Sequence, residues 1–160
     1  MELFHKLFDN KGPTLIFIKT GTGHIFGGFT SLNFKSISKY ELIYENFLFS
    51  IIDEHLRRPI RCKVIKQMAE YALRQSCEEY YSGFGIGNDA DLFVAFKKVN
   101  NFYYLGTIYK FPKAYNPKTF LAGKEVHWDI LDIEIYSINY ISDDEFFHLC
   151  SYFINIILFI

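Results

Sequence analysis

The sequence predicts a mainly β domain of the α+β class, built as a two-sheet antiparallel β-sandwich with a few flanking helices. Aromatic residues make up 19% of the 160-residue chain, and aromatic rings pack well on the half-buried faces of sheets. Short apolar runs of strand length recur along the chain, separated by turns rich in Gly, Pro and Asn. Strands do not alternate regularly with long helical segments, which favours antiparallel over parallel sheets.

The first half of the chain contains one expected hairpin and one expected buried strand. Leu15–Ile18 is a β-branched and aromatic run, and turn residues at Lys19–Gly23 separate it from the apolar run Ile25–Phe29. The next apolar run, Glu45–Ile52, ends at charged residues and is expected to be a strand buried on both faces or nearly so. Lys66–Tyr81 fits either a helical stripe or a short strand, and the sequence does not decide between them.

A second hairpin and one further strand are expected in the second half. Asp91–Phe96 and Asn101–Tyr109 have the composition of two strands joined by an Asn-containing turn. Ile130–Ile138 alternates almost strictly between apolar and polar residues, with Ile133 on one face and Glu134 on the other. We therefore expect a strand here that is half-buried.

Charge and cysteine usage limit the classes of partner. The formal net charge of -1 produces no field that would attract nucleic acid or an acidic membrane surface. The cysteines Cys62, Cys77 and Cys150 are odd in number and form no CxxC pair, which argues against a disulfide framework and favours a reducing compartment. Charged residues interrupt the apolar positions of residues 1–11, unlike a secretory signal. We expect a protein in a reducing, intracellular setting, whose main partner is neither nucleic acid nor an acidic membrane surface.

Short blocks of glycine, aromatic and acidic residues follow one another along the chain. They are Phe4–Leu7, Asp9–Leu15, Gly23–Ser31, Phe47–Ser50, Phe84–Gly87 with Asp91–Leu92, Leu105–Gly106, Phe120–Gly123 and Ile133–Tyr136. Each block alone is weakly specific, but the ordered series extends from Phe4 to Tyr140. In this order the blocks resemble the TLDc domain, the module of the oxidation-resistance proteins and their protist relatives.

The resemblance implies two antiparallel sheets packed face to face with helices at their sides. It also implies a non-catalytic protein-binding module linked to oxidative-stress resistance. Several members of the family bind the peripheral, cytosolic part of the vacuolar proton-pumping ATPase (V-ATPase) and modulate its assembly. The implied partner is therefore that pump, and the implied location is the cytoplasm, peripheral to vacuolar or other endomembranes through a protein complex.

The chain departs from the family pattern at both ends. Family members carry a helix and a first strand, ending in a turn like Ser-Arg-Asp-Gly, before the block that matches Phe4–Leu7. We therefore expect residues 1–145 to form a TLDc-like domain that lacks this N-terminal helix and strand. Residues 146–160 follow as a hydrophobic tail, whose only titratable side chains are His148, Cys150 and Tyr152.

This tail is too apolar to lie free in water. As a helix it would extend roughly 22 Å, less than the approximately 30 Å hydrocarbon core of a bilayer, so a full transmembrane anchor is not favoured. We expect it to pack on the domain, where it would cover the surface left by the absent strand, or to dock on a partner. Membrane contact is expected only indirectly or through this tail.

Glycines and carboxylates supply the candidate contacts with a partner. They are Phe26, Gly27, Gly28, Phe29, Gly85, Gly87, Asp91 and Glu134. Glycine allows another chain to approach the backbone closely. The structural alternatives are a bulge or tight strand crossing at Phe26–Phe29 and a turn at Phe84–Gly87. In the same alternative, Asp91 accepts N–H groups of the glycine-rich turn and Glu134 lies on an outer strand face.

The sequence offers no catalytic constellation, no metal site and no cofactor site. The histidines have no HxH or HExxH spacing, and no nucleophile, base and orienting residue can be grouped. Two other functions stay open. The cysteines would suit an antioxidant enzyme or thiol scavenger if they were not buried and inert, and the apolar tail would suit a structural component of a large assembly.

Overall fold

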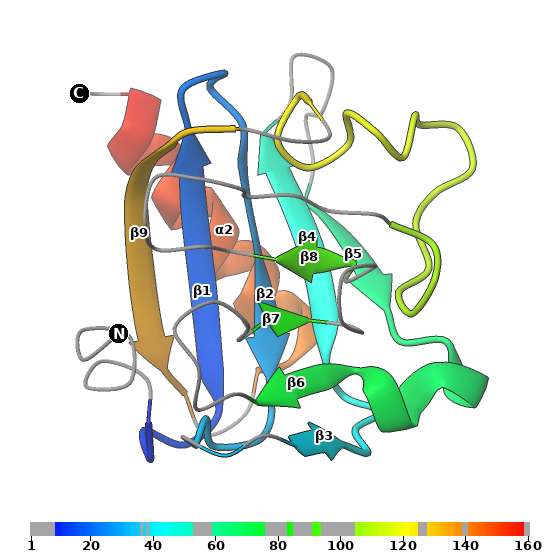
Figure 1. Cartoon of the computed structure of the whole chain (residues 1–160). Helices are drawn as coiled ribbons and strands as arrows, with labels where there is room; N and C mark the ends of the chain where they lie inside the picture. Colours follow the sequence, from blue (N-terminus) through cyan, green and yellow to red (C-terminus); the bar gives the residue numbers. More distant parts are fainter. Residues whose placement is uncertain are drawn as a thin grey trace.

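Strands dominate the computed structural model of the chain shown in Figure 1. The structure describes residues 9–35, 37, 39–52, 59–75, 83–84, 91–93, 105–124, 128–138 and 141–158. Within these ranges nine strands form two antiparallel sheets, accompanied by one 3-10 helix and one α-helix. The predicted fold class is confirmed.

The larger sheet has five strands in the order β5-β4-β2-β1-β9. They are β1 (Thr14–Thr20), β2 (Ile25–Thr30), β4 (Phe47–Ile52), β5 (Ile60–Lys63) and β9 (Ile130–Ser137). All neighbouring strands run antiparallel. β1 and β2 form the first predicted hairpin, and β9 is the strand predicted from the alternating run.

The smaller sheet has the order β3-β6-β7-β8. Its strands are β3 (Lys39–Glu41), β6 (Leu73–Gln75), β7 (Gly83–Phe84) and β8 (Leu92–Phe93). The 3-10 helix η1 (Lys66–Tyr71) comes directly before β6. The described part of the ambiguous segment, residues 66–75, is therefore helical first and extended afterwards. In Figure 1, β7 and β8 lie in front of the larger sheet and α2 lies behind it.

The space between the two sheets holds the first of two apolar cores. Ile16, Phe26 and Leu48 come from the three central strands of the larger sheet, and Leu73 comes from the smaller sheet. Ile133 of β9 packs against the same core, as the alternation in that strand predicted. The two sheets thus form the expected sandwich.

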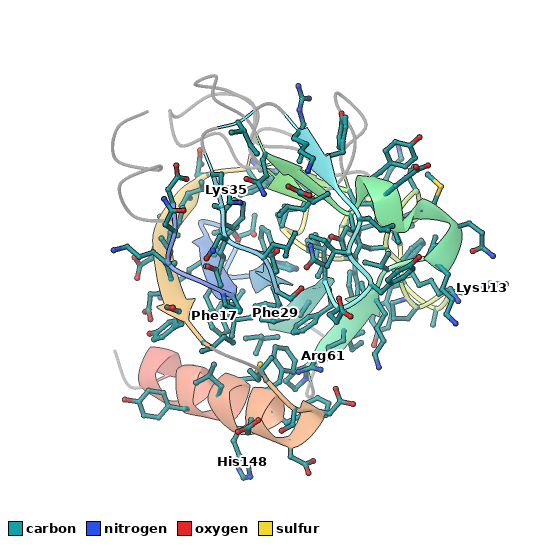
Figure 2. All side chains as sticks on the ribbon, turned by 90° about the horizontal axis from the view of Figure 1, so that it is seen from below. Phe17, Phe29, Lys35, Arg61, Lys113 and His148 are labelled. Carbon is teal, nitrogen blue, oxygen red and sulfur yellow. The ribbon has the colours of Figure 1, made fainter. Side chains whose placement is uncertain are left out.

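The second core lies on the other side of the larger sheet, beneath α2 (Asp143–Leu158). Phe17 and Phe49 point to this side and pack with Phe146 of the helix. Figure 2 shows Phe17, with Phe29 and Arg61, between the sheet and the helix. The prediction that Glu45–Ile52 contains a strand buried on both faces is confirmed, since the described β4 side chains are all buried.

The predicted tail is thus part of a helix that begins before it. Phe146 and Cys150 are fully buried against the domain, whereas His148 points away from the sheet in Figure 2. Packing on the domain was one of the two expected outcomes for the tail. No helix in the described ranges is long and apolar enough to cross a membrane.

The start of α2 is fixed by a capping box. The Glu145 N–H donates to Ser142 Oγ at 3.2 Å, and the Ser142 N–H donates to Glu145 Oε2 at 2.9 Å. Each side chain therefore satisfies a backbone group that the first turn leaves without an intrahelical partner. The bonds from Ser142 hold the pKa of Glu145 below its usual value.

Arg61 of β5 ties this end of the helix to the sheet. Its guanidinium carbon lies 4.1 Å from the centroid of the Phe47 ring and 4.0 Å from that of Phe146. The guanidinium also pairs with the Asp143 carboxylate and donates to the backbone oxygen of Ser142 at 3.2 Å. Cation–π contacts are strongest where the cation is shielded from water, as here between two rings.

The second predicted hairpin needs a correction. Its first strand is present as β8, and residues 94–104 lie outside the described residues. Leu105–Ile108, however, form a turn and not a strand. The N–H groups of Gly106 and Ile108 point to one side chain, Asp91, and are not available to a neighbouring strand.

We predict that Phe146→Ala destabilises the domain by about 3–5 kcal/mol, because it removes a fully buried ring from the second core. Urea denaturation followed by circular dichroism would measure this. The control is Phe147→Ala, whose ring is 42% exposed and whose loss should cost less than about 1 kcal/mol. Equal effects of the two substitutions would mean that α2 does not cover the sheet.

Candidate functional site

The predicted contact block Phe26–Phe29 lies inside the molecule. It belongs to β2, the middle strand of the larger sheet, and every residue of that strand is buried. Phe26 packs edge-to-face on Trp128 with 5.2 Å between ring centroids, and Phe29 stacks on Phe47 at 5.0 Å. A surface role does not fit this placement, because the smaller sheet covers one side of the larger sheet and α2 covers the other. Phe26, Gly27, Gly28 and Phe29 are core residues.

Gly27 marks the tight strand crossing that the sequence offered as the alternative. A Cβ atom built on Gly27 would lie 1.8 Å from the backbone oxygen of Ile16 and 2.8 Å from Cζ of Phe49. Both distances are shorter than van der Waals contact. Only glycine fits between β1 and the ring from β4, so the residue serves packing and not a partner.

Glu134 lies on the side of the larger sheet that α2 covers. It is half-buried, pairs in register with Phe17 of β1, and accepts a hydrogen bond from the Tyr136 hydroxyl. Burial and this bond to Glu134 raise the pKa of Tyr136 to about 12. Glu134 is therefore a half-buried hydrogen-bond acceptor at the margin of the second core.

Asp91 is fully buried between the sheets. Its carboxylate accepts the backbone N–H groups of Gly106 at 3.1 Å, Ile108 at 2.9 Å and Tyr109 at 2.8 Å. The alternative in which Asp91 accepts hydrogen bonds from backbone N–H groups is therefore supported. The donors among the described residues belong to the turn at residues 105–109, and the predicted glycine-rich turn at Gly85 and Gly87 lies outside the described residues.

The predicted site residues therefore do not form one site. Gly27 and Glu134 flank Phe17 in the register of three adjacent strands, whereas Asp91 lies among residues of the first core, near Cys62. In the parts of the chain that the structure covers, no three His, Cys, Asp or Glu side chains group as metal ligands would.

A surface that the sequence did not single out exposes large side chains next to β3. Tyr40, Leu42 and Tyr44 are 37%, 62% and 55% exposed, and we call them the Tyr40–Tyr44 surface. Ile43 between them is buried, and its N–H donates to the backbone oxygen of Ala69 at 3.0 Å. Tyr40 also packs edge-to-face on Tyr71 at 5.8 Å. Apolar and charged residues largely alternate over residues 39–45, a pattern that would place the apolar side inside and therefore gives no sign that these side chains are exposed.

Comparison with known families gives a match over most of the chain. The family model of the TLDc domain matches residues 1–139. The chain belongs to the TLDc domain family. The resemblance seen in the sequence is thereby confirmed, while no curated protein matches the chain. The match ends before α2, so the helix that covers the larger sheet lies beyond the matched part of this TLDc domain.

Two cysteines of the chain, Cys62 and Cys150, are buried in its cores. Burial raises the pKa of the Cys62 thiol to about 12, with a further contribution from Asp91. Burial likewise raises the pKa of Cys150 to about 12, although Arg61 opposes the shift. Both thiols stay protonated near neutral pH and are poor nucleophiles. Cys77 lies outside the described residues.

We expect neither Cys62 nor Cys150 to react with a disulfide reagent in the native protein, since both are buried and protonated. Cys77→Ser would serve as the background for this measurement. Absorbance assays should detect no thiol that reacts rapidly with the reagent before denaturation, and both thiols after it. Rapid labelling of native protein would show that one of these side chains is accessible.

Gly27→Ala should destabilise the domain by at least about 3 kcal/mol or prevent folding, because the new methyl group would overlap the Ile16 carbonyl. Gly21→Ala is the matched control, since the nearest atom to its Cβ is 3.9 Å away, an ordinary contact. Thermal unfolding of both variants would measure the difference. A stable Gly27→Ala protein would contradict the close crossing of β1 and β2.

Proposed function

We propose that this TLDc domain is a non-catalytic protein-binding module that associates with the peripheral, cytosolic part of the V-ATPase and regulates its assembly. Membership of the TLDc domain family over residues 1–139 carries this proposal. The module acts in resistance to oxidative stress. It works in the cytoplasm, at vacuolar or other endomembranes, through its protein complex.

The Tyr40–Tyr44 surface supports a binding role. Aromatic side chains are enriched at protein interfaces, and a few large side chains supply most of the binding energy. The backbone beneath these side chains is held by the buried Ile43 and its bond to Ala69. Such anchoring reduces the entropy that binding would otherwise cost.

The charged side chains of β3 favour contact with a partner through the Tyr40–Tyr44 surface over the addition of a partner's strand along the edge of the smaller sheet. Lys39 and Glu41 pair in register with Gln75 and Leu73 of β6, and the Lys39 side chain is exposed on this edge strand. They form an ion pair at 3.2 Å. Charged side chains on an edge strand, lysine above all, discourage the addition of another strand.

Co-purification with the isolated peripheral sector of the V-ATPase tests the proposal. We expect the wild-type chain to bind, and the double variant Leu42→Ser, Tyr44→Ser to bind at least about tenfold more weakly. The control is Leu131→Ser, which removes a side chain of comparable exposure, 65%, from β9 of the other sheet. It should bind like the wild type.

The outcomes of this experiment separate the function from the surface. Failure of the folded wild-type chain to bind the pump sector would overturn the proposed function. Binding that the double variant retains in full would leave the function intact and remove the Tyr40–Tyr44 surface from it. Circular dichroism of each variant would establish that the comparison is between folded proteins.

The alternatives from the sequence receive less support. A thiol scavenger needs an accessible thiolate, and Cys62 and Cys150 are buried with raised pKa values. The role as a structural component of an assembly was motivated by an uncovered tail. Phe146 and Cys150 of that tail are buried against the domain's own sheet, which weakens this motive.

A further inference from the structure

Two lysines lie opposite each other at the β5 edge of the larger sheet. Val64, directly after β5, forms an antiparallel bridge with Tyr109, and the Lys110 N–H donates to the Lys63 oxygen at 2.9 Å. Val64 and Tyr109 both belong to the first core. Because side chains alternate between the two faces of extended backbone, Lys63 and Lys110 both point to the opposite face, the one on which α2 lies. Both residues are exposed.

This arrangement costs the domain stability. Like charges directly opposite each other on neighbouring strands repel, and within the described ranges neither lysine forms an ion pair. Lys66 is the first residue of η1 and Lys113 lies in the loop after Lys110, and both are exposed as well. We call Lys63, Lys66, Lys110 and Lys113 the lysine surface.

The two segments that carry the lysine surface contain no acidic residue. Residues 60–69 and 105–124 have neither Asp nor Glu, although the whole chain has 18 acidic and 17 basic residues. The positive charge is therefore concentrated locally, and the net charge of -1 does not reveal it. Figure 2 shows Lys113 at one edge of the molecule, away from Lys35.

We infer that the lysine surface binds an acidic segment of a protein partner, whose carboxylates pair with the lysines and relieve their mutual repulsion. Charge complementarity of this kind directs a partner to one patch and fixes its register. This binding goes beyond the proposed function and holds whether or not the pump is the partner.

A carboxylate already binds on this face of β5. Arg61 lies roughly 7 Å from Lys63 along the strand, on the same side, and its guanidinium pairs with the Asp143 carboxylate of α2. Asp144 and Glu145 in the same turn of α2 are exposed. A membrane surface or a nucleic-acid backbone wide enough to cover the lysines would also meet these carboxylates and be repelled by them. A short acidic segment can cover the lysines alone, so the geometry favours a protein partner.

Binding of a short fluorescein-labelled oligoglutamate peptide to the intact chain, followed by fluorescence anisotropy, tests the inference. The salt concentration should be about 0.1 M, where a Debye length of about 10 Å screens distant charges. We expect the wild type to bind, and the double variant Lys63→Glu, Lys110→Glu to bind at least about tenfold more weakly. The matched control is Lys11→Glu, Lys35→Glu, which changes the net charge equally at exposed lysines outside the lysine surface. It should bind like the wild type.

The single variant Lys110→Glu distinguishes lost binding from misfolding. It places opposite charges across from each other at Lys63, so it should unfold at no lower temperature than the wild type. It should nevertheless bind the peptide more weakly. A lower unfolding temperature would contradict the placement of the two lysines on one face, and with it the inference.

Failure of the wild-type chain to bind the peptide would overturn the inference, as would an equal loss of binding in the Lys11→Glu, Lys35→Glu variant. Co-sedimentation with vesicles that contain phosphatidylserine tests the other class of partner. We expect no vesicle binding. Vesicle binding that the Lys63→Glu, Lys110→Glu variant loses would also overturn the inference, because the lysine surface would then bind a membrane.

Discussion

The burial of the larger sheet on both faces is the constraint on which the rest of this structure depends. Antiparallel sheets commonly cover one face and leave the other to solvent, which gives a clean alternation of apolar and polar residues. Here β1, β2 and β4 carry apolar side chains in both phases, and two separate cores result. Two covering layers are therefore needed, and the smaller sheet supplies one of them.

The second layer is α2, and its attachment explains several otherwise unrelated residues. The Phe17–Phe49 side of the sheet belongs to the part of the chain that matches the TLDc domain, whereas the helix follows that part. Arg61, held between Phe47 and Phe146, joins the two. The helix that appeared in the sequence as a surplus apolar tail thus completes the burial of the domain.

The same constraint explains why the glycine and aromatic blocks identified the family but not the exposed Tyr40–Tyr44 surface. Gly27 is required because a Cβ would strike β1, and Asp91 because the turn at residues 105–109 needs acceptors inside the core. The identity of these residues is therefore determined by how the strands and turns pack inside the domain. Exposed residues such as Leu42 lie where packing inside the domain does not constrain the side chain.

The sequence by itself determined the family, the antiparallel class, the hairpin of β1 and β2, and the alternation of β9. These features depend on residues close together in the chain, and their spacing can be read directly from the sequence. Only the tertiary structure decided that Phe26–Phe29 is covered on both sides, that Leu105–Ile108 turns toward Asp91, and that α2 packs on the larger sheet. Each of these depends on contacts between residues distant in sequence, and an apolar residue has the same pattern whether its own chain or a partner covers it.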